Sequence, residues 1–252
     1  MSTAAATAAR RLPRGWAHLA LQIAFWLGFY VAYQVARGLA DRGGVATAFA
    51  NGEWIIDFQR RLGSMMELTI QHAVEGSTVL IQVTSLTYWL SQFAVVGIAL
   101  TWVYFKAHDH FYGFRNTLIL GNLIGLVCYV LLPTAPPRMF PEAGFTDTLA
   151  AHSSVNHSSP FVAFSSNPYA AMPSLHALDA LIVSVVMAVV VRRRWAKALW
   201  LCWAPWVWFA VMGTGNHFWL DVAAGIVVAC VAAAVVYRAA LADGLRRLRA
   251  AT

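Results

Sequence analysis

The stretch Met172-Pro173-Ser174-Leu175-His176 decides how this chain folds, because a polar, turn-rich segment ends there and an apolar helix is predicted to begin. Pro173 suits the first turn of a helix, where its missing N–H costs no hydrogen bond. The Ser174 hydroxyl can cap backbone N–H groups at the same place. A helix start of this kind attracts anions, above all phosphate groups. His176 changes charge near neutral pH and can therefore transfer a proton.

A second stretch has the same build, Gly213-Thr214-Gly215-Asn216-His217-Phe218-Trp219-Leu220-Asp221. Small residues again form a turn before an apolar helix, and we expect His217 in the first turn of that helix. Asp221 follows four residues later, on the same helical face. A carboxylate at this spacing can hold an imidazole in one tautomer and stabilise its cation.

Composition places the chain in a membrane. Of its 252 residues, 60% are hydrophobic and 12% are charged, whereas a soluble domain carries about 25% charged residues. The mean hydropathy is +0.60. The three cysteines lie in apolar runs without paired spacing, so they are expected to be core residues rather than disulfides or metal ligands.

Six apolar runs are near the length of about 20 residues that a membrane-spanning helix needs. They predict an all-α fold, a six-helix transmembrane bundle forming one catalytic domain over residues 16–240. Residues 1–15 are expected to be a disordered, basic cytoplasmic flank, and residues 241–252 a basic cytoplasmic tail. The six predicted spans are 16–36, 78–105, 116–132, 174–191, 195–212 and 217–237.

Residues 41–76 have a mixed composition and predict an amphipathic helix that lies in the membrane interface. Charged residues fill the predicted polar face, Glu67 among them. This helix could support the bundle, or it could gate the entry of lipid. The predicted apolar face consists of Trp54, Ile55, Phe58, Leu62, Met65, Met66 and Ile70.

The basic residues predict the orientation of the bundle. Over alternate loops, 13 of the 18 Lys and Arg residues fall on one side and five on the other. Because positive charge favours the cytoplasmic side, both termini are expected inside an integral, multi-pass protein of the cell membrane. The basic excess is then a topology signal with contact to membrane lipids, and nucleic acid is not an expected partner. Arg138, His176, His217 and Asp221 all fall on the extracytoplasmic side and can meet in one pocket.

These residue types suit phosphoryl transfer. His217, oriented by Asp221, has a free imidazole nitrogen that could attack phosphorus and form a phosphohistidine. Protonated His176 could donate its proton to the leaving alkoxide. Two helix starts and Arg138 could hold the phosphoryl oxygens, so no metal and no cofactor is predicted. Further substrate-binding or phosphate-binding candidates are Ser174, Asn216, Asp179 and Tyr169.

Other polar residues in and near the spans are ambiguous. Asp179 could orient His176, bind a substrate hydroxyl, or form a hydrogen bond between helices. The triplet at 108–110, His-Asp-His, is expected in a solvated polar loop rather than at a metal. His152 and His157 are expected to be surface histidines.

Two stretches resemble the motifs of a known family. Residues 173–176 and 217–221 resemble the second and third motifs of the type 2 phosphatidic acid phosphatase superfamily, and Arg138 stands where its first motif ends. The resemblance covers the chain from about residue 80 to its end. It implies a six-helix membrane enzyme that acts on a phospholipid or polyprenyl phosphate without a metal. It also implies His217 as nucleophile, Asp221 as its partner and His176 as general acid.

The sequence departs from the superfamily's pattern at three positions. Leu175 stands where Gly is usual, Val211 where the third motif has Arg, and Leu131 where the first motif has Lys. Two phosphate-binding cations are thus missing, and the pattern is similar to the inositol-phosphorylceramide synthase branch, whose members move a phospho-headgroup between lipids. A site with fewer cations suits a phosphodiester, with one negative charge, better than a monoester with about two.

Several functions stay open at this point. Headgroup transfer and simple hydrolysis both fit the predicted site. A prenyl diphosphate enzyme could use the same pocket. A non-catalytic lipid-phosphate binder or transporter is the remaining class, and the lack of an internal repeat weighs against a transporter. A homo-oligomer is compatible with the sequence.

Overall fold

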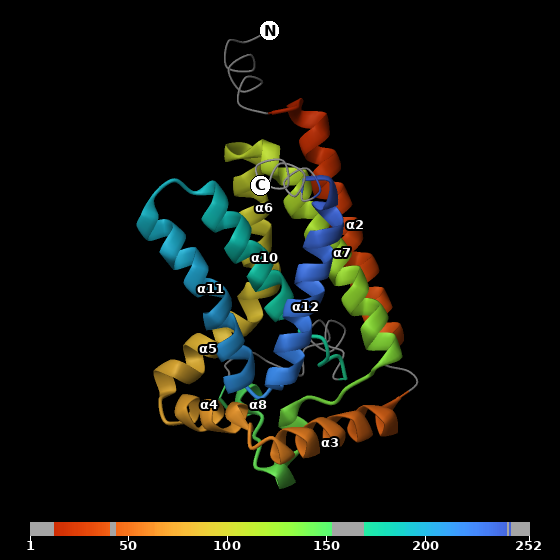
Figure 1. Cartoon of the computed structure of the whole chain (residues 1–252), viewed down its shortest axis with the longest axis vertical. Helices are drawn as coiled ribbons and strands as arrows, with labels where there is room; N and C mark the ends of the chain where they lie inside the picture. Colours follow the sequence, from red (N-terminus) through yellow and green to blue (C-terminus); the bar gives the residue numbers. More distant parts are fainter. Residues whose placement is uncertain (1–12, 41–43, 153–168, 241, 243–252) are drawn as a thin grey trace, which may run out of the picture.

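The computed structural model describes residues 13–40, 44–152, 169–240 and 242, and most of the predicted flank and tail, with His157, lies outside them. Most of the helices form a bundle, and two others lie across one of its ends (Figure 1). The bundle helices are α2 (Gly15–Ala40), α5 (Thr78–Leu90), α6 (Val96–Lys106), α7 (His108–Leu131), α10 (Leu175–Val190), α11 (Arg194–Gly213) and α12 (Trp219–Val236). The helices across the end are α3 (Val45–Arg61) and α4 (Met66–Glu75), beside the short α8 (Thr148–His152).

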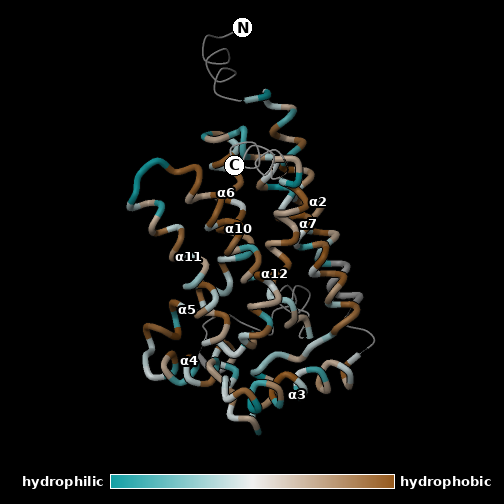
Figure 2. The backbone as a smooth tube through the Cα atoms, in the orientation of Figure 1, coloured by the Kyte–Doolittle hydropathy of each residue, from teal (hydrophilic) through white to brown (hydrophobic). Residues whose placement is uncertain are grey.

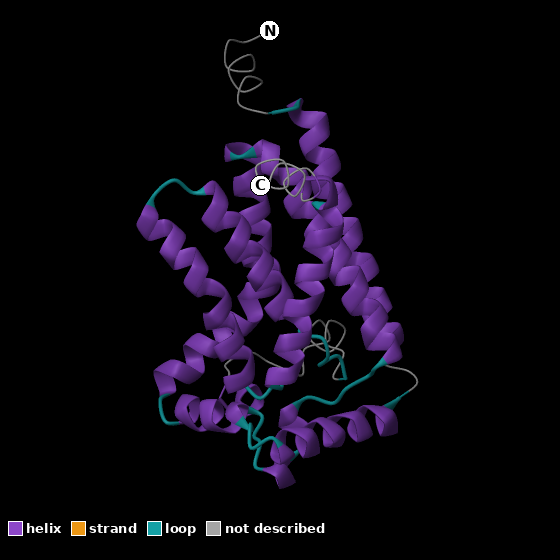
Figure 3. Cartoon of the chain, viewed as in Figure 1, coloured by secondary structure: helices purple, strands orange, loops and turns teal. Residues whose placement is uncertain are grey.

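The all-α prediction is confirmed for the described residues, whose regular elements are all helices (Figure 3). Four helices in this part of the chain are long and apolar enough to cross a membrane, and apolar residues run along the bundle (Figure 2). Helix α10 is apolar but has 16 residues, and α11 has 20 residues but includes Arg194 and Lys197. Length and composition therefore support four of the six predicted spans, namely Gly15–Gln34, Thr78–Lys106, His108–Leu131 and Trp219–Val236.

The predicted interfacial helix at 41–76 is in fact two helices. The backbone turns at Gly63, whose φ of +61° lies in the left-handed region. The N–H of Ser64 donates to the carbonyl of Gln59 at 3.0 Å and closes the turn. The single-helix prediction was wrong because the apolar spacing continues through this glycine.

The predicted polar face of this segment was also partly wrong, because Glu67 is buried. Trp54 and Leu62 are 61% and 57% exposed, whereas Gln59 and Glu67 are buried. The exposed Trp54 ring stacks on Phe58 and gives α3 an aromatic outer surface, which is typical of residues at a membrane interface. The polar residues are buried because they face α12, as described below.

Helix α7 begins eight residues earlier than predicted, so the triplet at 108–110 lies in its first turn and not in a polar loop. The Nδ1 atom of His108 lies 3.1 Å from the carbonyl oxygen of Tyr104, at the end of α6. Its ring packs between Tyr104 and Phe111. These contacts give His108 a structural place at the junction of α6 and α7.

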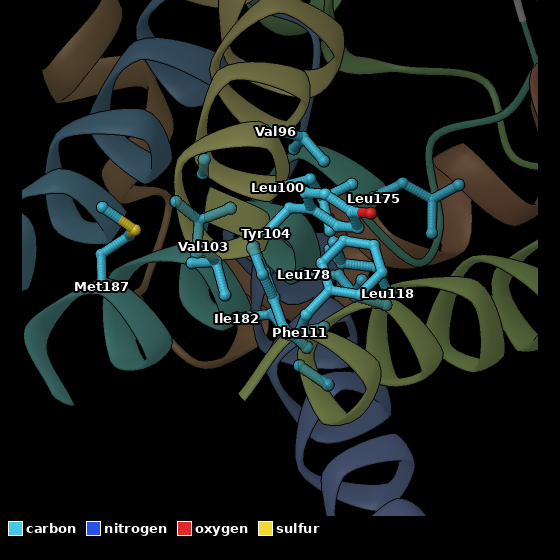
Figure 4. Close-up of a cluster of buried hydrophobic side chains, with 14 of the residues drawn as sticks. Val96, Leu100, Val103, Tyr104, Phe111, Leu118, Leu175, Leu178, Ile182 and Met187 are labelled. Atoms are coloured by element: carbon cyan, nitrogen blue, oxygen red, sulfur yellow. The ribbon is translucent and has the colours of Figure 1, made fainter. Parts of the chain in front are cut away.

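The main apolar core joins α6, α7 and α10 (Figure 4). A single π-helical turn, Ser91–Val95, connects α5 to α6 within one continuous apolar segment. Such turns redirect side chains and often occur near functional sites. The labelled core residues are Val96, Leu100, Val103, Tyr104, Phe111, Leu118, Leu175, Leu178, Ile182 and Met187.

The starts of α10 and α12 meet at the end of the bundle that α3 and α4 cover (Figure 1). The backbone N–H of Ser174 donates to the carbonyl of Asp221 at 2.9 Å. A Cβ atom on Gly225 would lie 2.3 Å from the Ser174 carbonyl oxygen, so only glycine permits this approach. The two histidine stretches are therefore side by side, as the sequence predicts. Helix α2 begins, and α12 ends, at the opposite end of the bundle (Figure 1).

Candidate active site

His217 lies just before α12 rather than in its first turn, because the helix starts at Trp219 with Phe218 as its N-cap. Its Nδ1 atom lies 2.9 Å from the carbonyl oxygen of Ala171 and 3.4 Å from Oδ2 of Asp221. A carbonyl can only accept, so Nδ1 must carry the proton. The lone pair of this neutral imidazole is then on Nε2.

The Ala171 carbonyl is placed by the segment that follows α7. Thr134 donates its N–H to the Tyr169 carbonyl at 2.8 Å and accepts from the N–H of Ala171 at 3.3 Å. This short bridge joins the segment before Arg138 to the segment before Ser174. The backbone, and not only the carboxylate, thus selects the tautomer of His217, which the sequence could not reveal.

Asp221 lies inside the first turn of α12 and is fully buried. Its Oδ2 atom accepts from the N–H of Phe218 at 2.9 Å, so the carboxylate caps the helix as well as facing His217. The i+4 relation is therefore confirmed as a contact, although the two residues do not share a helical face. The backbone bond fixes the carboxylate behind the imidazole.

His176 lies in the first turn of α10, as predicted, and is half-buried. Its ring centroid is 5.9 Å from that of His217, and it stacks on Tyr88 of α5 with centroids 4.5 Å apart. Ser174 caps the helix by accepting from the N–H of Ala177 at 3.3 Å. Pro173 was predicted in the first turn but precedes the cap. The hydroxyl of Ser174 is thus committed to the helix, and its other predicted role, binding phosphate, stays a prediction.

Arg138 is tied to the residue before His217. Its Nη1 atom donates to Oδ1 of Asn216 at 2.6 Å, and its backbone N–H donates to the Gly215 carbonyl at 2.8 Å. Asp147 approaches Nε at 3.6 Å and shares the charge. Gly215 has a φ of +69°, and a Cβ there would lie 2.7 Å from the Thr146 carbonyl oxygen. The turn therefore requires glycine to bring Arg138 beside the histidine loop.

Asp179 lies one turn deeper in α10 and is 3% exposed. Asn122 of α7 donates to its Oδ1 at 2.7 Å, and Gln92 of the π-helical turn hydrogen-bonds the same carboxylate. The contacts show the hydrogen bond between helices that the sequence left open. His176 therefore contacts Tyr88 near the start of α10, and Asp179 contacts Gln92 one turn deeper in the bundle.

Tyr169 is half-buried beside the site, and its ring contacts Phe49 of α3 with centroids 6.2 Å apart. Its backbone holds the Thr134 bridge, and a role in binding phosphate stays a prediction. Tyr88, the Ala171 carbonyl and Asp147 were not among the predicted site residues. The segment that contains Tyr88, residues 78–105, is rich in Ser, Thr and Gln, and segments of this composition tend to face other helices in a membrane bundle.

The arrangement brings two imidazole rings together beside a loop that holds a guanidinium group, and such groups could serve phosphoryl transfer. His217 presents Nε2, His176 stands nearby, and Arg138 supplies positive charge. No group of three His, Cys, Asp or Glu side chains in the described ranges could hold a metal ion. These residues suit charge stabilisation of a phosphoryl group better than coordination of Mg²⁺, which prefers several oxygen ligands.

Comparisons with known proteins identify the family and the fold of this chain. A 138-residue alignment at 30% identity relates 49% of the chain to 45% of a phosphoinositol dihydroceramide synthase from Bacteroides thetaiotaomicron, so the chain spans less than half of that relative. The crystal structure of Aquifex aeolicus LpxE shares the fold, with a TM-score of 0.51 at 14% identity over 69% of this chain and 93% of that one. The PAP2 superfamily model matches residues 53–235, which include every candidate site residue. The chain therefore belongs to the PAP2 superfamily.

Proposed function

We propose that this chain is an integral-membrane lipid phosphotransferase that acts through a phosphohistidine at His217. PAP2 superfamily enzymes are phosphatases and phosphotransferases. The observation that carries the proposal is the environment of Nδ1, which faces two acceptors, Ala171 and Asp221, and so leaves Nε2 as the nucleophile. The developing positive charge on the ring is stabilised by the buried carboxylate.

The first step forms a bond from Nε2 of His217 to phosphorus and breaks the bond from phosphorus to the leaving oxygen. Protonated His176 gives its proton to that oxygen, so the first product leaves as an alcohol. Arg138 and the N-terminus of α10 stabilise the negative charge on the phosphoryl oxygens. Tyr88 supports His176 by stacking on its ring.

In the second step, an acceptor hydroxyl attacks phosphorus and the bond to Nε2 breaks. His176, now neutral, takes the proton of the acceptor and is ready for the next cycle. Water as acceptor gives hydrolysis, whereas a lipid or polyol hydroxyl gives headgroup transfer. The same residues serve both outcomes, so the acceptor decides which reaction occurs.

Headgroup transfer is the better-supported outcome. The two positions where the superfamily usually has cations hold Val211, which is buried, and Leu131, which is 70% exposed on the outside of the bundle. The charge of Arg138 therefore faces the phosphoryl group without those two partners, which suits a phosphodiester with one negative charge. The relative named phosphoinositol dihydroceramide synthase supports the same choice.

A substrate panel tests this proposal. The purified protein is incubated with lipid phosphomonoesters and phosphodiesters, with and without polyol and ceramide acceptors, in the presence of EDTA. We expect an added acceptor hydroxyl to raise the turnover of a phosphodiester well above its hydrolysis by water, and we expect chelation to leave the rate within about twofold because no step uses a metal. Loss of activity in EDTA, restored by Mg²⁺, would exclude this mechanism, and rapid release of inorganic phosphate from monoesters would make the protein a phosphatase.

The orientation of the bundle is a further part of the proposal. The basic residues favour cytoplasmic termini, which puts α3, α4 and the site on the extracytoplasmic side. In a cysteine-free background, Glu142→Cys, at the site end, is expected to react with an impermeant maleimide in intact cells. Arg193→Cys, exposed between α10 and α11, should react only after permeabilisation. The reverse pattern would place the site in the cytoplasm.

A further inference from the structure

Glu67 is a buried carboxyl group that the mechanism above does not use. It lies in the first turn of α4 and is 1% exposed. With the amide of Gln59 oriented to satisfy both neighbours, its nitrogen donates to Oε1 of Glu67 at 2.6 Å and its oxygen accepts from the indole N–H of Trp219 at 2.7 Å. Trp219 is the first residue of α12, between His217 and Asp221. One buried chain of hydrogen bonds thus joins α3, α4 and the catalytic loop.

Two oxygen atoms of this region are left without a partner. Within the described part of the chain, Oε2 of Glu67 and Oδ1 of Asp221 are buried and make no hydrogen bond. A buried polar atom in this state destabilises the folded protein. A single proton between the two carboxyl groups would satisfy both atoms at once.

We propose that Glu67 is a positioning residue of the active site, whose neutral carboxyl group donates a hydrogen bond from Oε2 to Oδ1 of Asp221 and so fixes the carboxylate behind His217. This inference deepens the proposed function and rests on it for its catalytic consequence. Helix α4 would then position a residue of the active site as well as cover the end of the bundle. Gln59 completes the arrangement by holding the other oxygen of Glu67.

The electrostatic surroundings favour the neutral form. Burial, together with the smaller effect of the Asp221 charge, raises the pKa of Glu67 from 4.5 to about 7, against the lowering effect of its hydrogen bonds with backbone groups and Gln59. Helix α11 packs against α4, but its charged residues, Arg194 and Lys197, lie in its first turn at the other end. On α12 and the loop before it, the carboxyl and imidazole groups are those of Asp221 and His217, and these two contact each other.

The remaining charged side chains of α3 and α4 point away from Glu67. Glu53, Asp57, Arg60, Arg61 and His72 are exposed, and half-buried Glu75 accepts from the hydroxyl of Thr146. None of these side chains contributes to the shift in its pKa. Titration near pH 7 at this place is therefore expected to come from Glu67.

The sign of the pH effect follows from this pairing. Below its pKa, Glu67 is neutral and holds Asp221. Above it, two negative charges repel each other and the carboxylate loses its fixed position. Gln can accept from Gln59 and donate to Asp221 at every pH, so it mimics the neutral form. The ratio of the E67Q rate to the wild-type rate should therefore rise about tenfold from pH 6 to pH 8, because about a tenth of Glu67 stays neutral one unit above its pKa.

Thermal unfolding in detergent tests the same pairing without any turnover. A carboxyl group whose folded pKa is raised stabilises the protein at pH 4.5 and progressively less up to about pH 7. We expect the melting temperature of E67Q, relative to wild type, to increase by about 5 °C between pH 4.5 and pH 8. E67L, which can neither accept nor donate, should lose at least about tenfold in rate relative to wild type at pH 6, where Glu67 is neutral.

The matched control is E53Q, which removes an exposed carboxylate from α3. Its rate ratio and its melting-temperature difference, both relative to wild type, should not change with pH. If E67Q also shows a flat melting difference and a flat rate ratio, Glu67 does not titrate against Asp221 and the inference fails. If the melting difference appears but no substrate is turned over, the pairing stands and the proposed function fails. The two failures are thus distinguishable.

Discussion

Replacing His217 with alanine is expected to abolish the turnover of every substrate, with a loss of at least about 10⁴-fold in kcat. The reason is geometric, since the Ala171 and Asp221 acceptors engage Nδ1, so that Nε2 carries the lone pair that the proposed mechanism uses to attack phosphorus. A good leaving group cannot replace a missing nucleophile. Steady-state rates with an alkyl phosphodiester and with a nitrophenyl phosphoester measure the effect.

The control for this substitution is His72→Ala, which removes an exposed histidine from α4 and should keep the wild-type rate. Both variants should elute as the wild type does in size-exclusion chromatography. His217 precedes α12, so its replacement leaves the residues of that helix unchanged. Turnover by His217→Ala above about one per cent of wild type would show that another group is the nucleophile.

Replacing His176 with alanine is expected to separate the two kinds of substrate. The loss should be about 10²–10⁴-fold for an alkyl ester, whose alkoxide needs a proton to leave. It should be within about tenfold for the nitrophenyl ester, whose phenolate leaves unaided. The motivation is that His176 stands beside His217, with ring centroids 5.9 Å apart, but is held by stacking on Tyr88 rather than by a carboxylate.

Tyr88→Phe is the matched variant for this experiment, because it keeps the stacked ring and changes only the hydroxyl. It should retain most of the activity toward both esters. An equal loss on both esters in His176→Ala would mean that His176 binds the phosphoryl group and does not act as the general acid.

The sequence was sufficient to predict the start of α10, although it placed His217 inside α12 rather than before it. Ser174 caps α10, and His176 follows it in the first turn, because capping is a local property that side-chain chemistry encodes. The closeness of the two histidine stretches also followed from helix length and the order of spans. Gly225 then permits the close contact of α10 and α12 that brings the stretches together.

Other features depend on contacts distant in sequence and could not be predicted. The Ala171 carbonyl selects the tautomer of His217, and a backbone carbonyl has no sequence signature. Glu67 was assigned to a solvated face because local spacing cannot register Gln59, its partner on another helix. The break at Gly63 could not be predicted because the apolar spacing continues past this residue.

The most direct test of the central claim is single-turnover trapping of the phosphorylated enzyme. Wild-type protein is mixed with a substrate labelled at phosphorus, quenched in alkali, where a phosphoramidate survives, and mapped by mass spectrometry. We predict label on His217 in the wild type, none in His217→Ala, and retained label in His176→Ala with the nitrophenyl ester. Label that persists in His217→Ala, or that maps to His176, would contradict the assignment of His217 as the nucleophile.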